Sequence, residues 1–373
     1  MSGNRVGINF VTRKSSQGNP SFHEVKMTKK RISPNRNKDF QQAKQRKKDE
    51  FYTSLEDIEL EMVNYTDYFK GKVIYCNCDD PRESNFFRFF YNNFDHLGLK
   101  KLITACYRSQ NADNFESQLS EQAVYLEYSG MQNSNKSSID NLVHIKPFKG
   151  DGDFRSRESI ELLKQADVVV TNPPFSLFKE YCAQLVEYKK KFVIIGNMNA
   201  VTYKSIFPLF QKNKMWYGPS IRSGDREFRV PSNYPLSASG TRKDEHGNKF
   251  VRVKGVRWFT NLDYPSRHID LPLEKSYSPN RNPKYANFDA IEVSKTKDIP
   301  HDYDGPMGVP ITFIDKYNPE QFEILGSSRT LSKPMNEVAK KGTYTQGGPR
   351  FYLPKGDGTY RRMYERIVIK KKQ

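Results

Sequence analysis

Short apolar runs that alternate with helix-like segments constrain the fold of this chain more than any other feature. The clearest run, residues 166–171, is apolar and β-branched and lies between two helix-compatible segments, 156–165 and 177–188. Further β-forming runs lie at 72–78, 101–107, 123–128, 142–145 and 191–196. This alternation predicts an α/β fold with a doubly wound, Rossmann-like sheet, in which ligands bind beyond the carboxyl ends of the strands.

The pattern changes near residue 215. Beyond it, prolines and glycines are frequent and helical periodicity is scarce, so we predict a mostly β or irregular region over 215–373. Its expected paired strands lie near 250–261 and 311–314. Residues 1–48 are polar and basic without a sustained apolar period, and we expect them to form a flexible arm. The predicted ligand-binding α/β domain is therefore 49–214.

The net charge of +18 is concentrated at the two ends of the chain. Residues 1–50 hold 13 basic and 4 acidic side chains and residues 329–373 hold 12 and 3, whereas residues 51–328 are balanced. A neutral body with a basic extension at each end is typical of a protein that binds a polyanion, most often nucleic acid. Basic tails that only increase solubility are the alternative.

Apolar runs and cysteines indicate the compartment. No run approaches the ~18 consecutive apolar residues of a membrane span, and the N-terminus lacks the apolar core of a secretory signal. We therefore expect a cytoplasmic protein whose four cysteines are thiols. Cys76 and Cys78 are expected to face one side of a sheet, and because no pair of histidines is near them we expect no metal site.

A compact motif, Asn172-Pro173-Pro174-Phe175, directly follows the run 166–171. The two prolines lack N–H groups and hold the chain extended, which leaves the Asn172 side chain and the Pro173 carbonyl as two fixed acceptors. Phe175 adds a flat apolar face. A planar amide or the amino group of a nucleobase offers two N–H donors and a π-face, so it complements this motif. Ordinary turns also contain these residues, but a strand end favours a ligand site.

The motif resembles the N/D/S-P-P-Y/F/W signature of S-adenosylmethionine-dependent amino methyltransferases. Further segments resemble the EcoRI-type adenine-specific DNA methyltransferases over most of residues 45–330. In chain order they are 49–53, 76–81, 150–156, 166–178 and 192–203, and more weakly 256–262 and 308–326. The resemblance implies a site-specific enzyme that transfers the methyl group of S-adenosylmethionine to N6 of a flipped-out adenine in duplex DNA.

The resemblance also assigns roles at the target base. It implies that Asn172 and the Pro173 carbonyl accept hydrogen bonds from the target amine, and that Phe175 stacks on the extruded base. The positions matched to substrate binding are Pro174, Trp258 and Phe259. The last two could instead be packed residues of a strand, since adjacent strand residues face opposite sides and at most one can point into a pocket.

Other matched positions imply a cofactor site. Those matched to the methionine end of the cofactor are Phe51, Tyr52, Thr53, Cys78, Asp79 and Asp80. A carboxylate after the first strand could bind the ammonium group of that methionine, although acidic residues there also cap helices. Asp153 and Phe154 match the positions where an acidic residue accepts the adenine amino group and a ring packs on the adenine. Phe154 could also be an ordinary core residue.

The sequence departs from the broad methyltransferase superfamily at two points. No glycine-rich loop follows the first predicted strand, and no acidic residue that could bind ribose follows the second. Glu127, at the end of the run 123–128, is a candidate substitute for the acidic residue. The missing glycines favour an alternative, a non-catalytic DNA-binding protein on this scaffold. The same chemistry acting on cytosine N4, RNA or a protein amide is also open.

The order of the motifs implies how the chain is divided. The resemblance makes 49–214 the catalytic domain and 215–373 a target-recognition region with a basic C-terminal tail. Double-stranded DNA is the expected partner, and no membrane is. A cognate restriction endonuclease that acts separately could accompany the enzyme, which we expect to be a monomer in the cytoplasm of a bacterium or encoded by a phage.

Overall fold

The structure is a computed structural model that describes residues 52–78, 84–107, 123–130, 143–222, 224–230 and 240–372. All of these residues belong to one compact unit, 44–373. The predicted arm, 1–48, lies outside the described residues. None of the helices in the described part of the chain combines the length and the apolar character that crossing a membrane requires.

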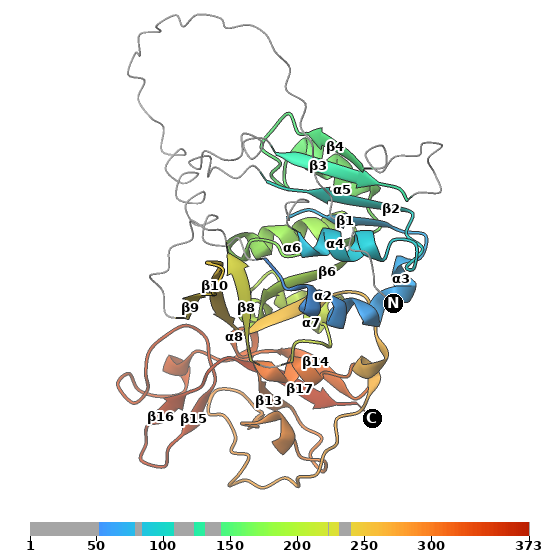
Figure 1. Ribbon diagram of the computed structural model, residues 1–373. Coiled ribbons are helices and arrows are strands. Elements are labelled where there is room, and N and C mark those ends of the chain that lie inside the picture. The colour runs from blue at the N-terminus through green and yellow to red at the C-terminus, as the bar shows by residue number, and fades with distance from the viewer. Residues whose placement is uncertain are drawn as a thin grey trace, which may run out of the picture. The chain divides into compact units, whose positions relative to one another are not determined.

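An eight-stranded sheet forms the centre of this unit, in the order β4-β3-β2-β1-β5-β6-β11-β7 (Figure 1). Its strands are β1 (Val73–Cys76), β2 (Lys101–Ala105), β3 (Val124–Tyr128), β4 (Val143–Pro147), β5 (Val168–Thr171), β6 (Lys191–Asn197), β7 (Trp216–Tyr217) and β11 (Val256–Thr260). The pairs that join β2, β1, β5 and β6 are parallel, and all the other pairs are antiparallel. The predicted α/β class is confirmed, with a large mixed sheet.

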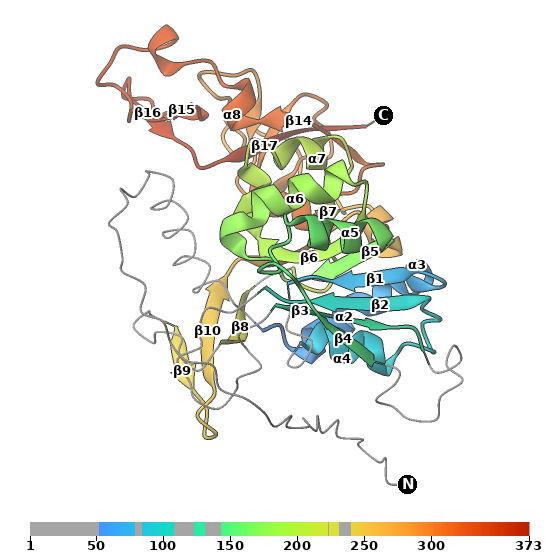
Figure 2. The same ribbon diagram turned by 90° about the horizontal axis from the view of Figure 1, so that it is seen from above.

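Helices cover both faces of this sheet (Figure 2). They are α2 (Leu55–Met62), α3 (Thr66–Phe69), α4 (Asn85–Asn92), α5 (Arg157–Gln165), α6 (Phe178–Glu187) and α7 (Phe207–Gln211). Alternate strand residues face opposite sides, so Val169 packs with α5, α6 and α7, whereas Val168 and Val170 pack with α2, α3 and α4. Ser54, Ser84 and Ser156 start α2, α4 and α5, where each hydroxyl accepts a backbone N–H.

A small sheet, ordered β8-β10-β9, lies in the sequence between β7 and β11 of the large one. Its strands are β8 (Asp225–Val230), β9 (Thr241–Lys243) and β10 (Lys249–Lys254). Strands predicted near 250–261 are present as β10 and β11, but they do not pair with each other. Gly255, with φ of 67°, is the single residue between them and redirects the chain from one sheet to the other.

The C-terminal region forms a four-stranded sheet, ordered β12-β13-β17-β14, and a hairpin of β15 and β16. These strands are β12 (Ile291–Glu292), β13 (Met307–Pro310), β14 (Phe322–Ser327), β15 (Tyr352–Pro354), β16 (Tyr360–Arg362) and β17 (Arg366–Lys371), with helix α8 (Ser328–Leu331). One face of the sheet shares a core with α7, because Ile367 and Ile369 are buried there.

Two predictions for this region are wrong. Residues 311–314 are not a strand but part of a 3-10 helix, Ile311–Lys316, since β13 ends at Pro310, which has no N–H to continue a ladder. The basic segment 329–373 is not an extension, because β17 lies between β13 and β14 inside a sheet. Its positive charges are therefore carried by a folded surface.

Candidate active site

Two polar segments leave the large sheet side by side, after β1 and after β5. The register pairs Ile74 with Val168 and Tyr75 with Val169, so these parallel neighbours end at the same level. The chain continues from β1 to β2 on one side and returns to β5 on the other, and such a reversal of strand order is where open α/β sheets bind ligands. Asn77 follows β1 and Asn172 follows β5, which brings both amides to this edge.

Asn172 is held in place by a residue far from it in the sequence. Its side chain is 7% exposed, and its Nδ2 donates to Oγ1 of Thr53 at 3.4 Å. Thr53 is itself 2% exposed, and its carbonyl accepts a hydrogen bond from Nδ2 of Asn85, the first residue of α4, at 2.7 Å. With the amide nitrogen turned toward Thr53, the amide oxygen is directed away from it.

The remaining residues of the motif convert strand into helix. Pro173 is buried, and Pro174 has φ of −55° and ψ of 125°, an extended conformation. Phe175 begins a 3-10 turn, Phe175–Leu177, that leads directly into α6. Its ring is half-buried and packs on one side against the core beneath the sheet. The motif therefore has a fixed backbone and one partly exposed aromatic ring.

The segment that carries Thr53 is attached to the small sheet. The N–H of Tyr52 donates to the carbonyl of Arg229 in β8 at 2.9 Å, and the Arg229 guanidinium lies 5.2 Å from the centre of the Tyr52 ring. One turn further on, Asp57 forms an ion pair with Arg226 at 3.2 Å. No local sequence pattern predicts these contacts, because they join residues about 170 positions apart. Phe51 lies outside the described residues.

A buried row of three side chains lies behind the ends of β1 and β5. Tyr181 of α6 donates its hydroxyl to Oδ1 of Asn77, and its ring packs edge-on against Phe154 with centroids 5.1 Å apart. Burial raises the pKa of Tyr181, so the phenol stays protonated as a donor. Sequence reasoning missed Tyr181, whose only signal is its place on the apolar face of a helix. Phe154 belongs to the core cluster, as its alternative interpretation allowed.

Asp153, matched to the cofactor's adenine, already has a partner. Arg155 donates Nε and Nη2 to the two carboxylate oxygens at 2.9 and 2.8 Å, and this pairing raises the pKa of Arg155. The same guanidinium lies 5.3 Å from the centre of the Phe154 ring. The predicted role of Asp153 stays a prediction. Asp79 and Asp80 lie outside the described residues.

Trp258 and Phe259 lie in the middle of β11, and both are 0% exposed. Trp258 packs edge-on against Phe86 with centroids 6.0 Å apart, on the α2 and α4 face. Phe259 lies on the opposite face, with its centroid 4.8 Å from that of Phe178. The expectation that the two face opposite sides is confirmed, and their predicted contact with the target base stays a prediction.

Glu127 is not a ribose-binding candidate, and that interpretation is wrong. Because β3 runs antiparallel to β2, the end of β3 lies beside the start of β2, at the edge of the sheet opposite the site. Glu127 is bonded there to Lys101 and, at 2.6 Å, to Lys146. Burial alone would raise the pKa of Glu127, but the hydrogen bonds from the two lysines lower it.

The positions of Cys76 and Cys78 differ from the prediction. Cys76 and Cys78 do not face one side of the sheet, because β1 ends at Cys76, and the two pack against different core clusters. Cys78, matched to the cofactor, is half-buried just beyond the strand. Over the described residues, no three His, Cys, Asp or Glu side chains are grouped as ligands for a metal ion.

Comparison with known proteins identifies the family of this chain. Residues 39–372 match the family model described as "Adenine-specific methyltransferase EcoRI". The chain belongs to this family. It is therefore an adenine-specific methyltransferase.

Three curated relatives are each named as a Type II methyltransferase. The chain is 52% identical to "Type II methyltransferase M.EcoRI" of Escherichia coli over 291 residues, 78% of this chain and 89% of that one. It is 39% identical to "Type II methyltransferase M.MpnI" of Mycoplasma pneumoniae, covering 90% and 98%. It is 38% identical to "Type II methyltransferase M.MgeORF184P" of Mycoplasma genitalium, covering 90% and 99%. No solved structure matches the chain.

Proposed function

We propose that this methyltransferase transfers the methyl group of S-adenosylmethionine to N6 of an adenine flipped out of duplex DNA. The observation that carries the proposal is Asn172 at the end of β5, buried and held by Thr53 within Asn172-Pro173-Pro174-Phe175. The motif lies where parallel strand order reverses, which supports a Rossmann-like arrangement of β2, β1, β5 and β6. Membership of the adenine-specific family supports the choice of base.

The chain's own residues position the amine that reacts. The Asn172 oxygen and the Pro173 carbonyl would accept the two N6 hydrogens of adenine, which draws the nitrogen lone pair out of conjugation with the ring. Phe175 would hold the flipped base by stacking. Because these groups are fixed before the substrate arrives, they stabilise the charge that develops on N6 without reorganising. The hydrogen bond from Asn172 to Thr53 makes Thr53 a positioning residue for this acceptor.

The residues around the site fit the proposed cofactor. S-adenosylmethionine supplies an electrophilic methyl group when it is bound. Amide, hydroxyl and carboxylate groups follow β1 and precede α5. They would accept hydrogen bonds from the ammonium, hydroxyl and amino groups of the cofactor. The buried phenol of Tyr181 holds one of these acceptors, the Asn77 amide, in place. The residues proposed to hold the cofactor are Phe51, Tyr52, Thr53, Cys78, Asp79, Asp80, Asp153 and Phe154.

The rest of the chain is proposed to serve the DNA. We assign residues 49–214 to the catalytic domain and 215–373 to target recognition, although β7 and β11 of the second region complete the large sheet. Pro174, Trp258 and Phe259 remain the proposed substrate-binding residues beside the motif. The basic segment 1–48 is assigned to phosphate contacts. The enzyme is proposed to act as a monomer on cytoplasmic DNA, with any cognate endonuclease acting separately.

Methylation-sensitive sequencing tests this function. DNA is taken from a methylase-free bacterial host that expresses the wild type, the Asn172→Ala variant or, as a control, Asn92→Ala, which changes an exposed asparagine at the end of α4. We expect N6-methyladenine at one recognition sequence with the wild type and the control, and none with Asn172→Ala. Methylated cytosine, or unmodified DNA from a folded wild type that binds S-adenosylmethionine, would overturn the proposal.

A further inference from the structure

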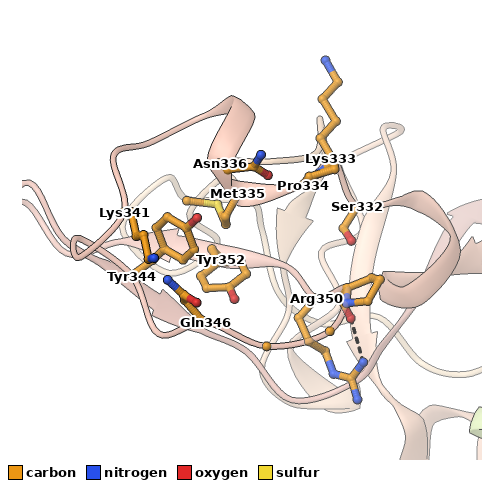
Figure 3. Close-up of a pocket in the computed structure, with 13 residues that line it drawn as sticks. Ser332, Lys333, Pro334, Met335, Asn336, Lys341, Tyr344, Gln346, Arg350 and Tyr352 are labelled. Atoms are coloured by element: carbon orange, nitrogen blue, oxygen red, sulfur yellow. Dashed lines mark hydrogen bonds between the residues drawn. The ribbon is translucent and has the colours of Figure 1, made fainter.

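A pocket lies in the C-terminal region, separate from the proposed active site. It has a volume of about 460 Å³ and lies between the segment that follows α8 and the loop that leads into β15 (Figure 3). Its charged lining residues are Lys333, Lys341 and Arg350, and no Asp or Glu is among the lining residues. A pocket lined by three cations and no carboxylate is suited to an anionic ligand.

The positive charge around this pocket is only partly compensated. Arg350 and Arg329 share one carboxylate, that of Glu365, at 3.1 and 2.6 Å. Arg362 donates to the carbonyl of Gly348, a lining residue, at 3.0 Å, and its Nε is buried without a hydrogen-bond partner. Burial lowers the pKa of Arg350, and repulsion from Arg329 and Arg362 adds to this effect. An added anion would therefore relieve repulsion that Glu365 alone does not remove.

The floor of the pocket is aromatic and rigid. Tyr352 is buried and donates its hydroxyl to the carbonyl of Thr345 at 2.7 Å. Tyr344 packs edge-on against it with ring centroids 5.8 Å apart. In Figure 3, Lys341, Tyr344 and Gln346 lie together at one end of the pocket, Ser332 and Arg350 lie at the other, and the Lys333 side chain extends away from the rings. Lys341 and Arg350 thus lie at opposite ends, with the Tyr352 ring between them.

The loop beneath the pocket leaves its backbone accessible. Gly347 and Gly348 carry no side chains, and a Cβ added at Gly348 would meet no atom within 4 Å. A ligand can therefore approach the main chain closely there.

We infer that this pocket binds the sugar–phosphate backbone of the DNA duplex, away from the base that is methylated. The inference rests on the proposed function, which supplies a DNA substrate. Phosphates would lie at the two cationic ends, with the sugar that joins them in between. A single small anion would engage only one end, whereas successive phosphates of a strand engage both. Three of the 12 basic residues in 329–373 would then contact the polyanion in this pocket.

The test compares two double variants with the same change in net charge. Lys333→Ala with Lys341→Ala removes two exposed cations of the pocket, and Lys212→Ala with Lys214→Ala removes two exposed cations near α7. Duplex affinity is measured by fluorescence anisotropy across a series of salt concentrations, with specific and non-specific sequences. We expect the pocket variant to lower the slope of log K against log salt by about 1.8, because each lost phosphate contact removes about 0.9.

The outcomes separate the pocket from the catalytic function. The pocket variant should weaken specific and non-specific binding by the same factor, and the control variant should keep the wild-type slope. Thermal melting and calorimetric binding of S-adenosylmethionine check that both variants are folded. An unchanged slope in a folded pocket variant overturns the inference, as does an equal loss in the control. If the slope differs between wild type and pocket variant as predicted, but the wild type leaves adenine unmethylated, the proposed function would be refuted and the inference about the pocket would stand.

Discussion

Two aromatic segments of one sheet differ in what surrounds them. Phe175 stands just beyond β5, half-buried beside the fixed amide of Asn172, whereas Trp258 and Phe259 lie within β11 with no exposed surface. Inside a strand, each ring is committed to the core on its own side of the sheet. Beyond the strand, the backbone no longer pairs and can direct groups at a ligand. Position along the strand therefore decides whether an aromatic ring keeps an exposed face.

The largest effect on stability is expected within β11. Trp258→Ala should lower the free energy of unfolding by about 3–5 kcal/mol, since the ring is completely buried and its loss leaves a cavity. Urea denaturation, monitored by the circular dichroism of the backbone so that the signal does not depend on tryptophan, measures this change. Phe175→Ala is the matched aromatic truncation outside the strand. A Trp258→Ala protein that is as stable as the wild type, but inactive, would show that the ring does not stabilise the core and would place Trp258 at the target base.

A buried carboxylate gives the next effect. Glu61 of α2 accepts hydrogen bonds from the Tyr65 hydroxyl at 2.7 Å and the Ser220 N–H at 2.9 Å, and burial raises its pKa to about 7. The folded state therefore holds this proton more tightly than the unfolded state. Stability should fall as pH rises from about 4.5 to about 7 and then level off, by at most about 3 kcal/mol for this shift.

The pH dependence has its own control. In Glu61→Gln the amide oxygen can accept from the Ser220 N–H and the amide NH2 can donate to the Tyr65 hydroxyl oxygen, but the side chain does not titrate, so the stability of this variant should lack the decline between pH 4.5 and 7. Denaturation curves at several pH values for both proteins measure the difference. Parallel pH profiles would show that Glu61 is ionised throughout, and that the interior around α2 tolerates a charge.

A smaller effect is expected at Phe175, and it concerns the substrate. Phe175→Ala should weaken binding of a duplex with a flipped base by about 1–3 kcal/mol, the contribution of one stacked base, while Phe175→Tyr should be tolerated. The fluorescence of 2-aminopurine at the target position measures base flipping and should rise when the wild type binds. A probe that stays dark with the wild type would argue against flipping, and an unaltered signal with Phe175→Ala against stacking.

Local patterns predicted the parts of the fold that local physics determines. Runs at 72–78, 101–107, 123–128, 142–145, 166–171 and 191–196 all contain strands of the large sheet, and the central strands read as continuous apolar runs because helices bury both faces of the sheet. The site motif was also predictable from local physics, because prolines restrict the backbone wherever they occur. Asn172 beyond β5 follows directly from these two signals.

Long-range pairings were not predictable in this way. Nothing in the sequence near Glu127 shows that β3 runs antiparallel to β2, and that direction moves Glu127 to the wrong edge. The bond between Tyr52 and Arg229 and the central place of β17 likewise depend on segments far apart in the chain. Strand direction and order are decided by packing between such segments, which a single sequence pattern does not contain.

Asn172 is proposed to act in methyl transfer and not to stabilise the fold. Single-turnover methyl transfer, at saturating DNA and S-adenosylmethionine, tests this role in Asn172→Ala beside the Asn92→Ala control. We expect the rate to fall by about 10²–10³, the contribution of one preorganised polar group, while the free energy of unfolding and the cofactor affinity change little. A wild-type rate in Asn172→Ala, or a loss of rate that merely follows a loss of folded protein, would contradict it.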